Sequence, residues 1–294
     1  MSAPELTVTE TFKAGIYDID ERLYHQDPVA GGSLSSSGAK KLLECPAKYH
    51  HDRTAGEQFK DTYNFGSAVH TSVLGAGREV IYLDYPDYRK AEARDAKEEV
   101  IAAGNYPLLI KDQAGVVAIT NAVHAHPEAR ALLGQDGAAE QSVLWEMDGI
   151  RKRARPDFLP SKPSDNGRLL VVDFKTAVDS SPAAFSRSCA NFGYAQQDAW
   201  YSEGIAKVTG LDVAFLFVVV EKEPPYVVSV YELDELAKRI GEHRNDIAIR
   251  RYIECTESGI WPGYVTGIEQ LALPRWAEIE YQEQIEMQQE GYAA

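Results

Sequence analysis

One apolar segment constrains the fold of this chain more than any other feature. Residues 168–176 read RLLVVDFKT, and within VVDFKT the only charges are Asp173 and Lys175. A short apolar run that follows a polar loop and ends in charged residues predicts a buried strand. Residues 214–220 (AFLFVVV) predict a second, central strand, and residues 226–233 predict an edge strand beside it.

Helical and hairpin patterns surround these strands. Residues 140–159 hold two alternating segments around the turn Asp148-Gly149, which predicts a β-hairpin. Helices are expected over 33–52 (kinked or divided at Pro46), 65–74, 86–103, 113–133 (interrupted near Pro127), 182–190, 194–208 and 234–254. Helices first, then strands with further helices, predict an α/β fold: a mixed central β-sheet flanked by helices, with a helical N-terminal part.

We expect three parts along the chain. Residues 1–32 form an irregular lead-in, residues 33–255 form a single domain, and residues 256–294 form an acidic C-terminal extension. Within the domain, a helical part covers 33–135 and the sheet core covers 138–255. The extension carries five glutamates after Pro274, and a solvated acidic surface is the simplest interpretation of them.

The overall charge limits the classes of function. A net charge of −15, from 30 Lys and Arg against 45 Asp and Glu, argues against a protein that coats nucleic acid. Any contact with nucleic acid must therefore be local, in a basic groove or through a metal. No segment approaches the roughly 18 apolar residues of a membrane span, and no secretory signal is seen, so we expect a cytoplasmic protein without a membrane partner. Three scattered cysteines predict neither a disulfide framework nor a zinc or iron–sulfur site.

The strand ends carry the candidate chemistry. Asp173 and Lys175 are two residues apart in a strand, so their side chains project to the same side, about 7 Å apart. If the strand that bears Asp157 pairs beside them, two carboxylates and one ammonium converge. Such a site suits Mg²⁺ or Mn²⁺, and the lysine can orient or help to deprotonate an attacking water. A D-x-K sequence at a strand end is also common as a merely solvated sheet edge.

The motifs resemble those of a known family. Pro156-Asp157 with Asp173-Phe174-Lys175 resembles the core motif of the PD-(D/E)xK nuclease superfamily. FGSAVH (65–70) resembles the G-x-x-x-H helix of RecB-type nuclease domains, and GYAQQDAWY (193–201) resembles their Y-x-x-Q-x-x-x-Y helix. Residues 33–52 and 139–159 resemble the first helix and the central hairpin of RecE-like exonucleases. The ordered likeness extends from about residue 20 to residue 255.

The resemblance implies roles for individual residues. Asp157 and Asp173 would be metal ligands, joined by the backbone carbonyl of Phe174, and Lys175 would activate the nucleophilic water. His70 would lie near the metal as a ligand or phosphate contact, although a lone histidine on an apolar helix face is often a core residue.

Other implied roles have equally simple structural alternatives. Glu140 would support the first or a second metal, or have only a structural role. Gln197 and Tyr201, with Tyr194, would brace the site or contact the DNA backbone; Gln197 and Tyr201 are four residues apart, so simple packing explains them as well.

Basic side chains supply a candidate DNA track. Alternation would place Arg151, Arg153 and Arg155 on the strand face that continues to Asp157, where they would hold phosphates beside the metal. Lys40 and Lys41 on the first helix would extend this groove. A solvated edge strand remains the alternative, and no element that reads base sequence is found.

The implied activity is a Mg²⁺-dependent exodeoxyribonuclease, with Mn²⁺ as a substitute and no iron–sulfur cluster. By resemblance, it would degrade the 5′-ended strand of linear duplex DNA and pass single strands to a RecT-type annealing protein in phage recombination. A homo-oligomeric ring around DNA would reconcile the acidic surface with this role. The alternatives are a single-strand nuclease or endonuclease on the same fold, and a non-catalytic binding module or DNA mimic.

Overall fold

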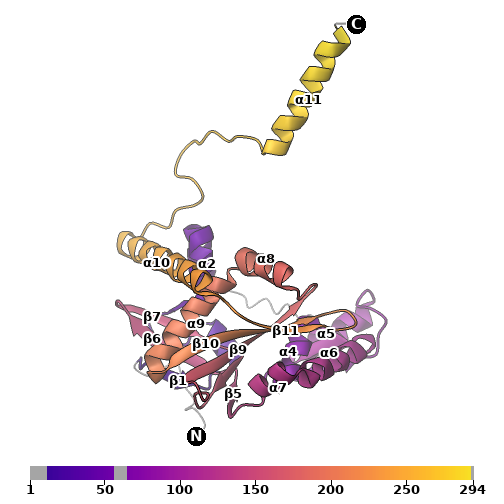
Figure 1. Cartoon of the computed structure of the whole chain (residues 1–294), viewed down its shortest axis with the longest axis vertical. Helices are drawn as coiled ribbons and strands as arrows, with labels where there is room; N and C mark the ends of the chain where they lie inside the picture. The colour runs from indigo at the N-terminus through magenta and orange to yellow at the C-terminus, as the bar shows by residue number, and fades with distance from the viewer. Residues whose placement is uncertain (1–11, 56–64, 293–294) are drawn as a thin grey trace.

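The central sheet is built on two long parallel strands. In the computed structural model, which describes residues 12–55 and 65–292, β9 (Arg168–Ala177) pairs with β10 (Asp212–Glu221) along their whole length. The sheet order is β11-β10-β9-β8-β5, where β11 (Val228–Glu232), β8 (Phe158–Pro160) and β5 (Gly137–Ala139) are all antiparallel to their neighbours. The predicted mixed sheet flanked by helices is confirmed (Figure 1).

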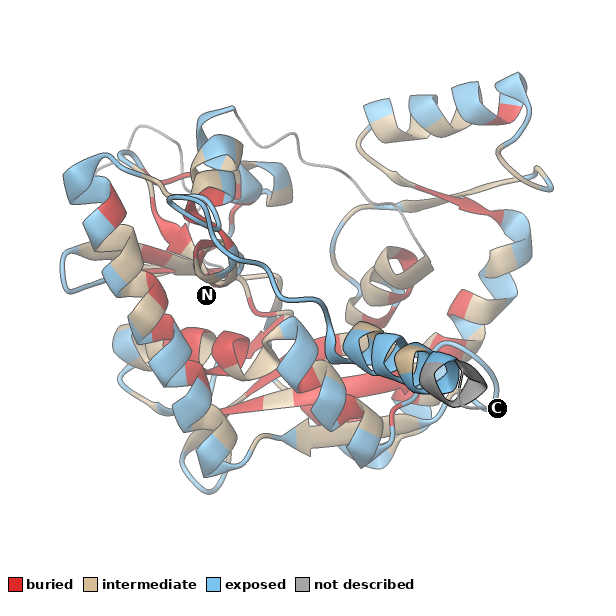
Figure 2. Cartoon of the chain, turned by 90° about the horizontal axis from the view of Figure 1, so that it is seen from above, coloured by how far each residue is buried: buried red, intermediate tan, exposed pale blue. Residues whose placement is uncertain are grey.

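Alternation along β9 and β10 divides the interior into two cores. Leu169, Val171, Phe215 and Phe217 lie in one core with Trp200. Side chains of the opposite parity, including Val172, Phe174, Val218 and Val220, lie in the other core with Val69 and Ile119. Figure 2 shows buried residues concentrated in the strands and on the helix faces toward them. Asp173 and Lys175 share the parity of the first core.

A second sheet holds the predicted hairpin. β6 (Ser142–Met147) and β7 (Ile150–Ala154) are antiparallel around the turn at Asp148-Gly149. Two short strands, β1 (Gly15–Tyr17) and β2 (Leu34–Ser35), extend it to the order β1-β6-β7-β2.

The lead-in is more regular than the sequence predicts. Residues 1–11 lie outside the described residues, but β1 pairs with β6, and α1 (Glu21–His25) follows with Asp20 as its N-cap. A strand of three residues and a helix of five are too short to give a periodic pattern, and β6 supplies the pairing that defines β1.

Helices cover both faces of the central sheet. α2 (Ser36–Glu44) and α3 (Pro46–Thr54) are divided at Cys45-Pro46, because proline is tolerated only in the first turn of a helix. α8 (Pro182–Phe192), α9 (Tyr194–Thr209) and α10 (Glu235–Ser258) lie on one side with α2, and α4 (Phe65–Leu74), α6 (Gln113–Ala125) and α7 (Pro127–Leu133) lie on the other (Figure 1).

The region 76–111 contains an element that the sequence pattern does not reveal. β3 (Val80–Leu83) and β4 (Tyr106–Leu109) form a small parallel sheet, connected by α5 (Ala91–Ala102) and followed by the single 3-10 turn Ile110–Asp112.

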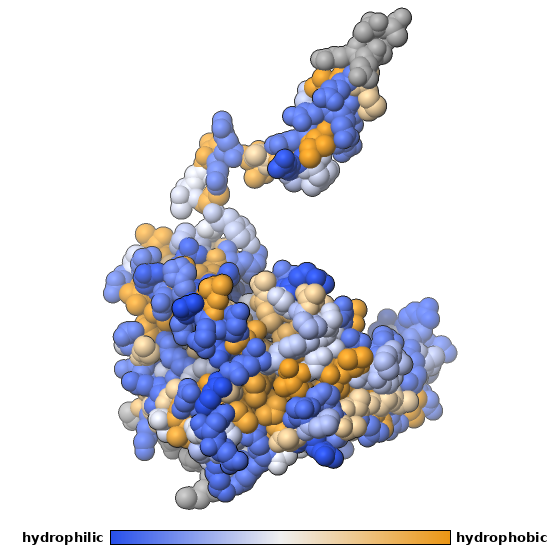
Figure 3. Space-filling view, viewed as in Figure 1, coloured by the Kyte–Doolittle hydropathy of each residue, from blue (hydrophilic) through white to orange (hydrophobic). Residues whose placement is uncertain are grey.

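The C-terminal extension ends in a helix that stands apart from the body. Residues 259–274 leave the end of α10, and Trp261 stacks on His50 with ring centres 4.7 Å apart. α11 (Arg275–Tyr292) then projects away with a mostly hydrophilic surface that includes apolar patches (Figures 1 and 3). Among the residues that the structure describes, no helix combines the length and apolar character of a membrane span.

Candidate active site

Asp157 lies where the chain passes from one sheet to the other. Arg155, Pro156 and Asp157 connect β7 of the hairpin sheet with β8 of the central sheet. Proline has no N–H and cannot continue a ladder, so the pairing of β7 with β6 ends at Ala154, before the chain enters β8 and pairs with β9. Asp157 Oδ2 accepts a hydrogen bond of 2.6 Å from the backbone N–H of Phe174, which fixes this carboxylate to β9.

Asp173 and Lys175 form a buried ion pair on the α9 side of β9. Lys175 Nζ lies 2.5 Å from Asp173 Oδ2, and Gln197 Nε2 donates to Asp173 Oδ1 at 2.7 Å. The Asp173 side chain is 1% exposed and that of Lys175 is 22% exposed. Burial raises the pKa of Asp173 to about 6, although the charge of Lys175 opposes this effect. Burial disfavours the charged lysine, yet the two aspartates raise the pKa of Lys175 above its ordinary value.

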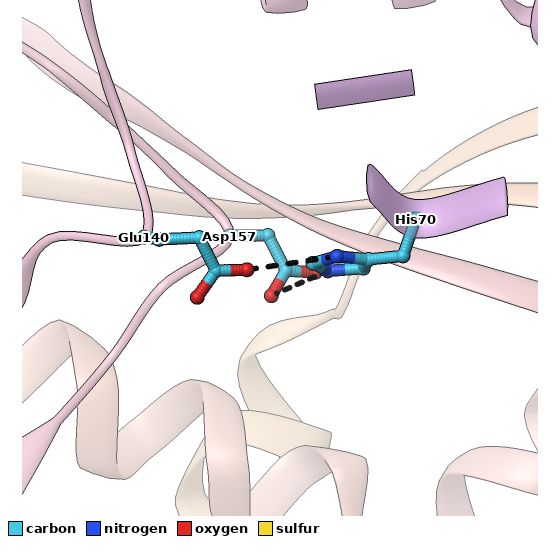
Figure 4. Close-up of side chains that lie close together, drawn as sticks. All are labelled: His70, Glu140 and Asp157. Atoms are coloured by element: carbon cyan, nitrogen blue, oxygen red, sulfur yellow. Dashed lines mark ion pairs between the residues drawn. The ribbon is translucent and has the colours of Figure 1, made fainter. Parts of the chain in front are cut away.

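His70, Glu140 and Asp157 form a compact group of metal-type donors. His70 Nε2 lies 3.2 Å from Asp157 Oδ1, and His70 Nδ1 lies 3.5 Å from Glu140 Oε1 (Figure 4). One ligand atom from each residue lies within 4.8 Å of the others. Burial opposes a charge on the imidazole, but Asp157 and Glu140 raise the pKa of His70 to about 9.

Glu140 is held in an unusual backbone conformation. Its φ of 57° lies in the left-handed region, which costs a non-glycine residue about 1–2 kcal/mol. The Glu140 N–H donates to the Asp157 carbonyl at 3.0 Å, and Arg155 Nε donates to Glu140 Oε2 at 2.6 Å. These contacts maintain the strained backbone and direct the carboxylate toward His70, as expected where strain accompanies a functional site.

A divalent cation fits this donor set. Ligand atoms at about 2.1 Å from one Mg²⁺ lie at most about 4.2 Å apart, so the three donors need only small shifts to share an ion. The two carboxylates are suitable ligands for Mn²⁺ or Mg²⁺, and the imidazole adds a nitrogen donor beside them. A cavity of about 570 Å³ lined by His70, Glu140, Phe174 and Lys175 gives a substrate access to them.

Asp173, the second predicted metal ligand, lies outside the compact donor group. Among the described residues, that group consists of His70, Glu140 and Asp157, whereas Asp173 contacts Lys175 and Gln197. The sequence indicates that the acids converge, but it does not show that Lys175 lies against Asp173.

The predicted aromatic residues lie at different depths. The Tyr194 ring is 5.1 Å from Lys175 Nζ, directly beside the site. Tyr201 packs edge-on against Phe215 of the core at 5.5 Å and also lines a second cavity of about 450 Å³ that includes Gln197 and Lys40.

The arginines of β7 have partners within the chain. Arg151 donates to the Ala30 carbonyl, and Arg153 donates to the Ser33 carbonyl at 2.7 Å and pairs with Asp27 at 3.1 Å. Arg155 binds Glu140 and the Ile19 carbonyl. These guanidinium groups therefore fasten the N-terminal segment to the hairpin sheet.

The two lysines of α2 differ in environment. Lys41 forms an ion pair with Asp52. Lys40 Nζ donates to the Phe192 carbonyl at 2.9 Å, and burial together with the charge of Lys175 lowers the pKa of Lys40 to about 8. Lys40 is thus electrostatically coupled to the site.

A β-strand that presents Asp173 and Lys175 beside Asp157, with a histidine supplied from a preceding helix, defines the PD-(D/E)xK class of fold. Residues 35–274 match the family model described as "PDDEXK-like domain of unknown function (DUF3799)", and the chain belongs to this family. The predicted membership of the PD-(D/E)xK superfamily is thereby confirmed.

One of the similar solved structures shares the overall fold at low sequence identity. The crystal structure of a candidate exonuclease from Eubacterium rectale is 11% identical, with a TM-score of 0.55 over 86% of this chain and 93% of that one. An alkaline exonuclease from Laribacter hongkongensis is 14% identical, with a TM-score of 0.27 over 65% of this chain and 90% of that one. No curated protein sequence matches the chain.

Proposed function

We propose that the protein is a divalent-metal-dependent deoxyribonuclease that hydrolyses phosphodiester bonds of linear duplex DNA. The observation that carries the proposal is the placement of the His70–Glu140–Asp157 donor group beside the Lys175–Asp173 pair, with an open cavity lined by residues of both. Metal donors and a cation beside one accessible space are what hydrolysis of a phosphodiester requires.

His70, Glu140 and Asp157 would hold the ion, because they are already close to its ligand spacing. Asp173 and the Phe174 carbonyl would complete the ligand set. A bound Mg²⁺ or Mn²⁺ supplies Lewis-acid polarisation of the phosphate and a more acidic water. The Phe174 N–H keeps Asp157 in position, which leaves the other carboxylate oxygen directed toward His70.

Lys175 would orient the attacking water and offset charge that develops on the phosphate. Its ammonium lies at the boundary between the buried Asp173 and the cavity, so it can contact both. Gln197 is a positioning residue, because its amide restrains Asp173 from the α9 side.

The finer assignment follows the RecE-like resemblance. We propose an exonuclease that degrades the 5′-ended strand, acts in the cytoplasm of a bacterial or phage-infected cell, assembles as a homo-oligomeric ring and supplies single strands to a RecT-type annealing protein. The fold shared with the candidate exonuclease supports only the scaffold for this activity.

The basic residues near the site would contact phosphates in two ways. Lys40, which lies beside Tyr194 and is coupled to Lys175, needs no change in the fold to do so. Arg153 and Arg155 would first have to exchange their present partners, whereas the more exposed Arg151 would not need to release a buried acid.

The decisive experiment compares wild type with Lys175→Ala on linear and covalently closed duplex DNA, with Mg²⁺ and with chelator. Each strand of the linear duplex carries its own end label. We expect wild type to release nucleotides from the 5′-ended strand of linear DNA only, and Lys175→Ala to lose this activity. Lys162→Ala, which alters an exposed lysine paired with Asp136, is the matched control and should cut normally. Equal cutting by Lys175→Ala would refute the assigned site, and cutting of the closed circle would indicate an endonuclease.

A further inference from the structure

Phe192 is an exposed aromatic residue close to the candidate active site. It is the last residue of α8, and 61% of it is exposed. Gly193 follows with φ of 65°, a left-handed conformation that ends α8 and begins α9. The break between the two helices leaves the Phe192 ring at the surface.

The Phe192 ring continues a series of rings that begins in the core. Phe217 of β10 is fully buried and lies 5.7 Å from the Tyr194 ring, with the two planes inclined by 30°. Tyr194 in turn lies 5.8 Å from Phe192, at 33°. The orientation of Phe192 is therefore supported from beneath, and its exposed surface is available to another flat ring.

This series passes directly beside the catalytic lysine. Lys175 Nζ is 5.1 Å and Lys40 Nζ is 5.9 Å from the Tyr194 ring centre, and Lys40 also donates to the Phe192 carbonyl. The Phe192 ring centre thus lies within about 11 Å of Lys175 Nζ, the sum of the two ring contacts. That distance is about three base steps at 3.4 Å each.

We propose that Phe192 is a stacking platform for an unpaired base of the cleaved strand, within three nucleotides of the attacked phosphate. Aromatic side chains beside cationic groups bind single-stranded nucleic acid in this way, without reading its sequence. The inference rests on the proposed nuclease function and adds that the cleaved strand is separated from its complement at the site. An exposed phenylalanine alone is ordinary, but this one is supported by the core and lies next to two lysines.

The first test measures kcat/KM on linear duplex with Mg²⁺ for full-length Phe192 variants. Loss of one stacked base corresponds to about a 5- to 150-fold reduction, which we expect for Phe192→Ala. Phe192→Tyr should stay within about twofold of wild type, and Phe192→Leu, which is apolar without a ring, should resemble the alanine variant. Trp276→Ala removes a similarly exposed aromatic residue from the projecting α11 and should have no effect.

The second test removes the base instead of the ring. A single abasic nucleotide within the first three positions of the cleaved strand should slow wild type by a similar factor and should slow Phe192→Ala no further. An abasic nucleotide in the complementary strand should have no effect. The assignment would be overturned if the abasic nucleotide and Phe192→Ala reduced kcat/KM independently, so that their effects multiplied. It would also be overturned if Phe192→Leu were as active as Phe192→Tyr.

A binding measurement separates this inference from the proposed function. The probe is 2-aminopurine at the same positions of a duplex with a single-stranded end, bound in Ca²⁺ without turnover. Fluorescence quenching that requires Phe192 supports the platform even if wild type cuts no DNA, an outcome that would refute only the nuclease proposal. Quenching that is the same in wild type and Phe192→Ala would refute the platform while leaving nuclease activity unaffected.

Discussion

The ion pair between Lys175 and Asp173 should control the stability of the metal-free protein. Lys175 Nζ and Asp173 Oδ2 are 2.5 Å apart, which corresponds to an attraction of about 7 kcal/mol at an effective dielectric constant of about 20. The free-energy cost of desolvating both groups cancels most of this attraction. Removing one partner of a buried pair nevertheless costs about 3–5 kcal/mol, because the other charge stays buried. Since Lys175 is 22% exposed, we expect Lys175→Met to cost about 3 kcal/mol.

The assay is urea unfolding in chelator at neutral pH. Asp173→Asn and the double variant complete a mutant cycle, and the double variant should recover about 2 kcal/mol relative to Lys175→Met alone. The matched control is Lys238→Met. Lys238 is 20% exposed and pairs at 2.9 Å with Glu232, which is 34% exposed, so its loss should cost less than about 1 kcal/mol.

Two results would contradict this expectation: Lys175→Met destabilises the protein no more than Lys238→Met, or the effects of Lys175→Met and Asp173→Asn on stability simply add. Either result would mean that Lys175 and Asp173 do not interact in the metal-free protein. The geometric basis of the candidate site would then be lost, whatever the activity of the variants.

Three further predictions concern the surroundings of the site. Because the Glu140 backbone is left-handed, Glu140→Gly should be about 1 kcal/mol more stable than Glu140→Ala in urea unfolding, and equal stabilities would contradict the strained conformation. Both variants should weaken Mg²⁺ binding measured by calorimetry. Burial raises the pKa of Asp198 to about 7, so the folded state retains a proton that the unfolded chain releases, and stability contributed by this group falls as pH rises from about 4 to 7. The free energy of unfolding of Asp198→Asn should therefore rise relative to that of wild type across this pH range, by at most about 1.4 kcal/mol per unit of pKa shift. Parallel profiles of stability against pH for the two proteins would contradict this prediction. Removal of residues 266–294 keeps the contact between Trp261 and His50 and should leave the melting temperature and the rate of DNA cleavage unchanged. A lower melting temperature or slower cleavage would show that α11 belongs to the functional unit.

Local periodicity was sufficient to predict the elements that position the site. The apolar run 168–176 predicts a strand with Asp173 and Lys175 on one side, and β9 places both side chains toward α9. The helix predicted over 65–74 matches α4, and the hairpin around Asp148-Gly149 matches β6 and β7. These elements have strong patterns because one face of each is buried.

Pairing between distant segments could not be predicted in the same way. The alternation of β7 predicts that Arg153 and Arg155 share a face, but not that Asp27 and the carbonyls of Ile19 and Ser33 occupy that face. Those partners lie more than 100 residues earlier in the chain, in a segment without a periodic pattern. Basic residues in one row therefore indicate where cations lie, but not whether they are free to bind phosphate.

The charges of the site link metal binding to phosphate binding. Three carboxylates, Glu140, Asp157 and Asp173, face two permanent cations, Lys175 and Arg155, which leaves one excess negative charge once His70 has released its proton to act as a ligand. A divalent ion changes this excess to one positive charge, which a single phosphodiester neutralises. Binding of the metal ion should therefore strengthen binding of the phosphate, and binding of the phosphate must strengthen binding of the metal by the same factor. We expect Mg²⁺ to bind about 5- to 150-fold more tightly when an uncleavable phosphorothioate duplex is present, as measured by calorimetry. Arg155→Ala should leave the site with no excess charge after metal binding and so weaken this coupling. Equal Mg²⁺ affinity with and without the duplex would show that metal and phosphate do not meet at the donor group.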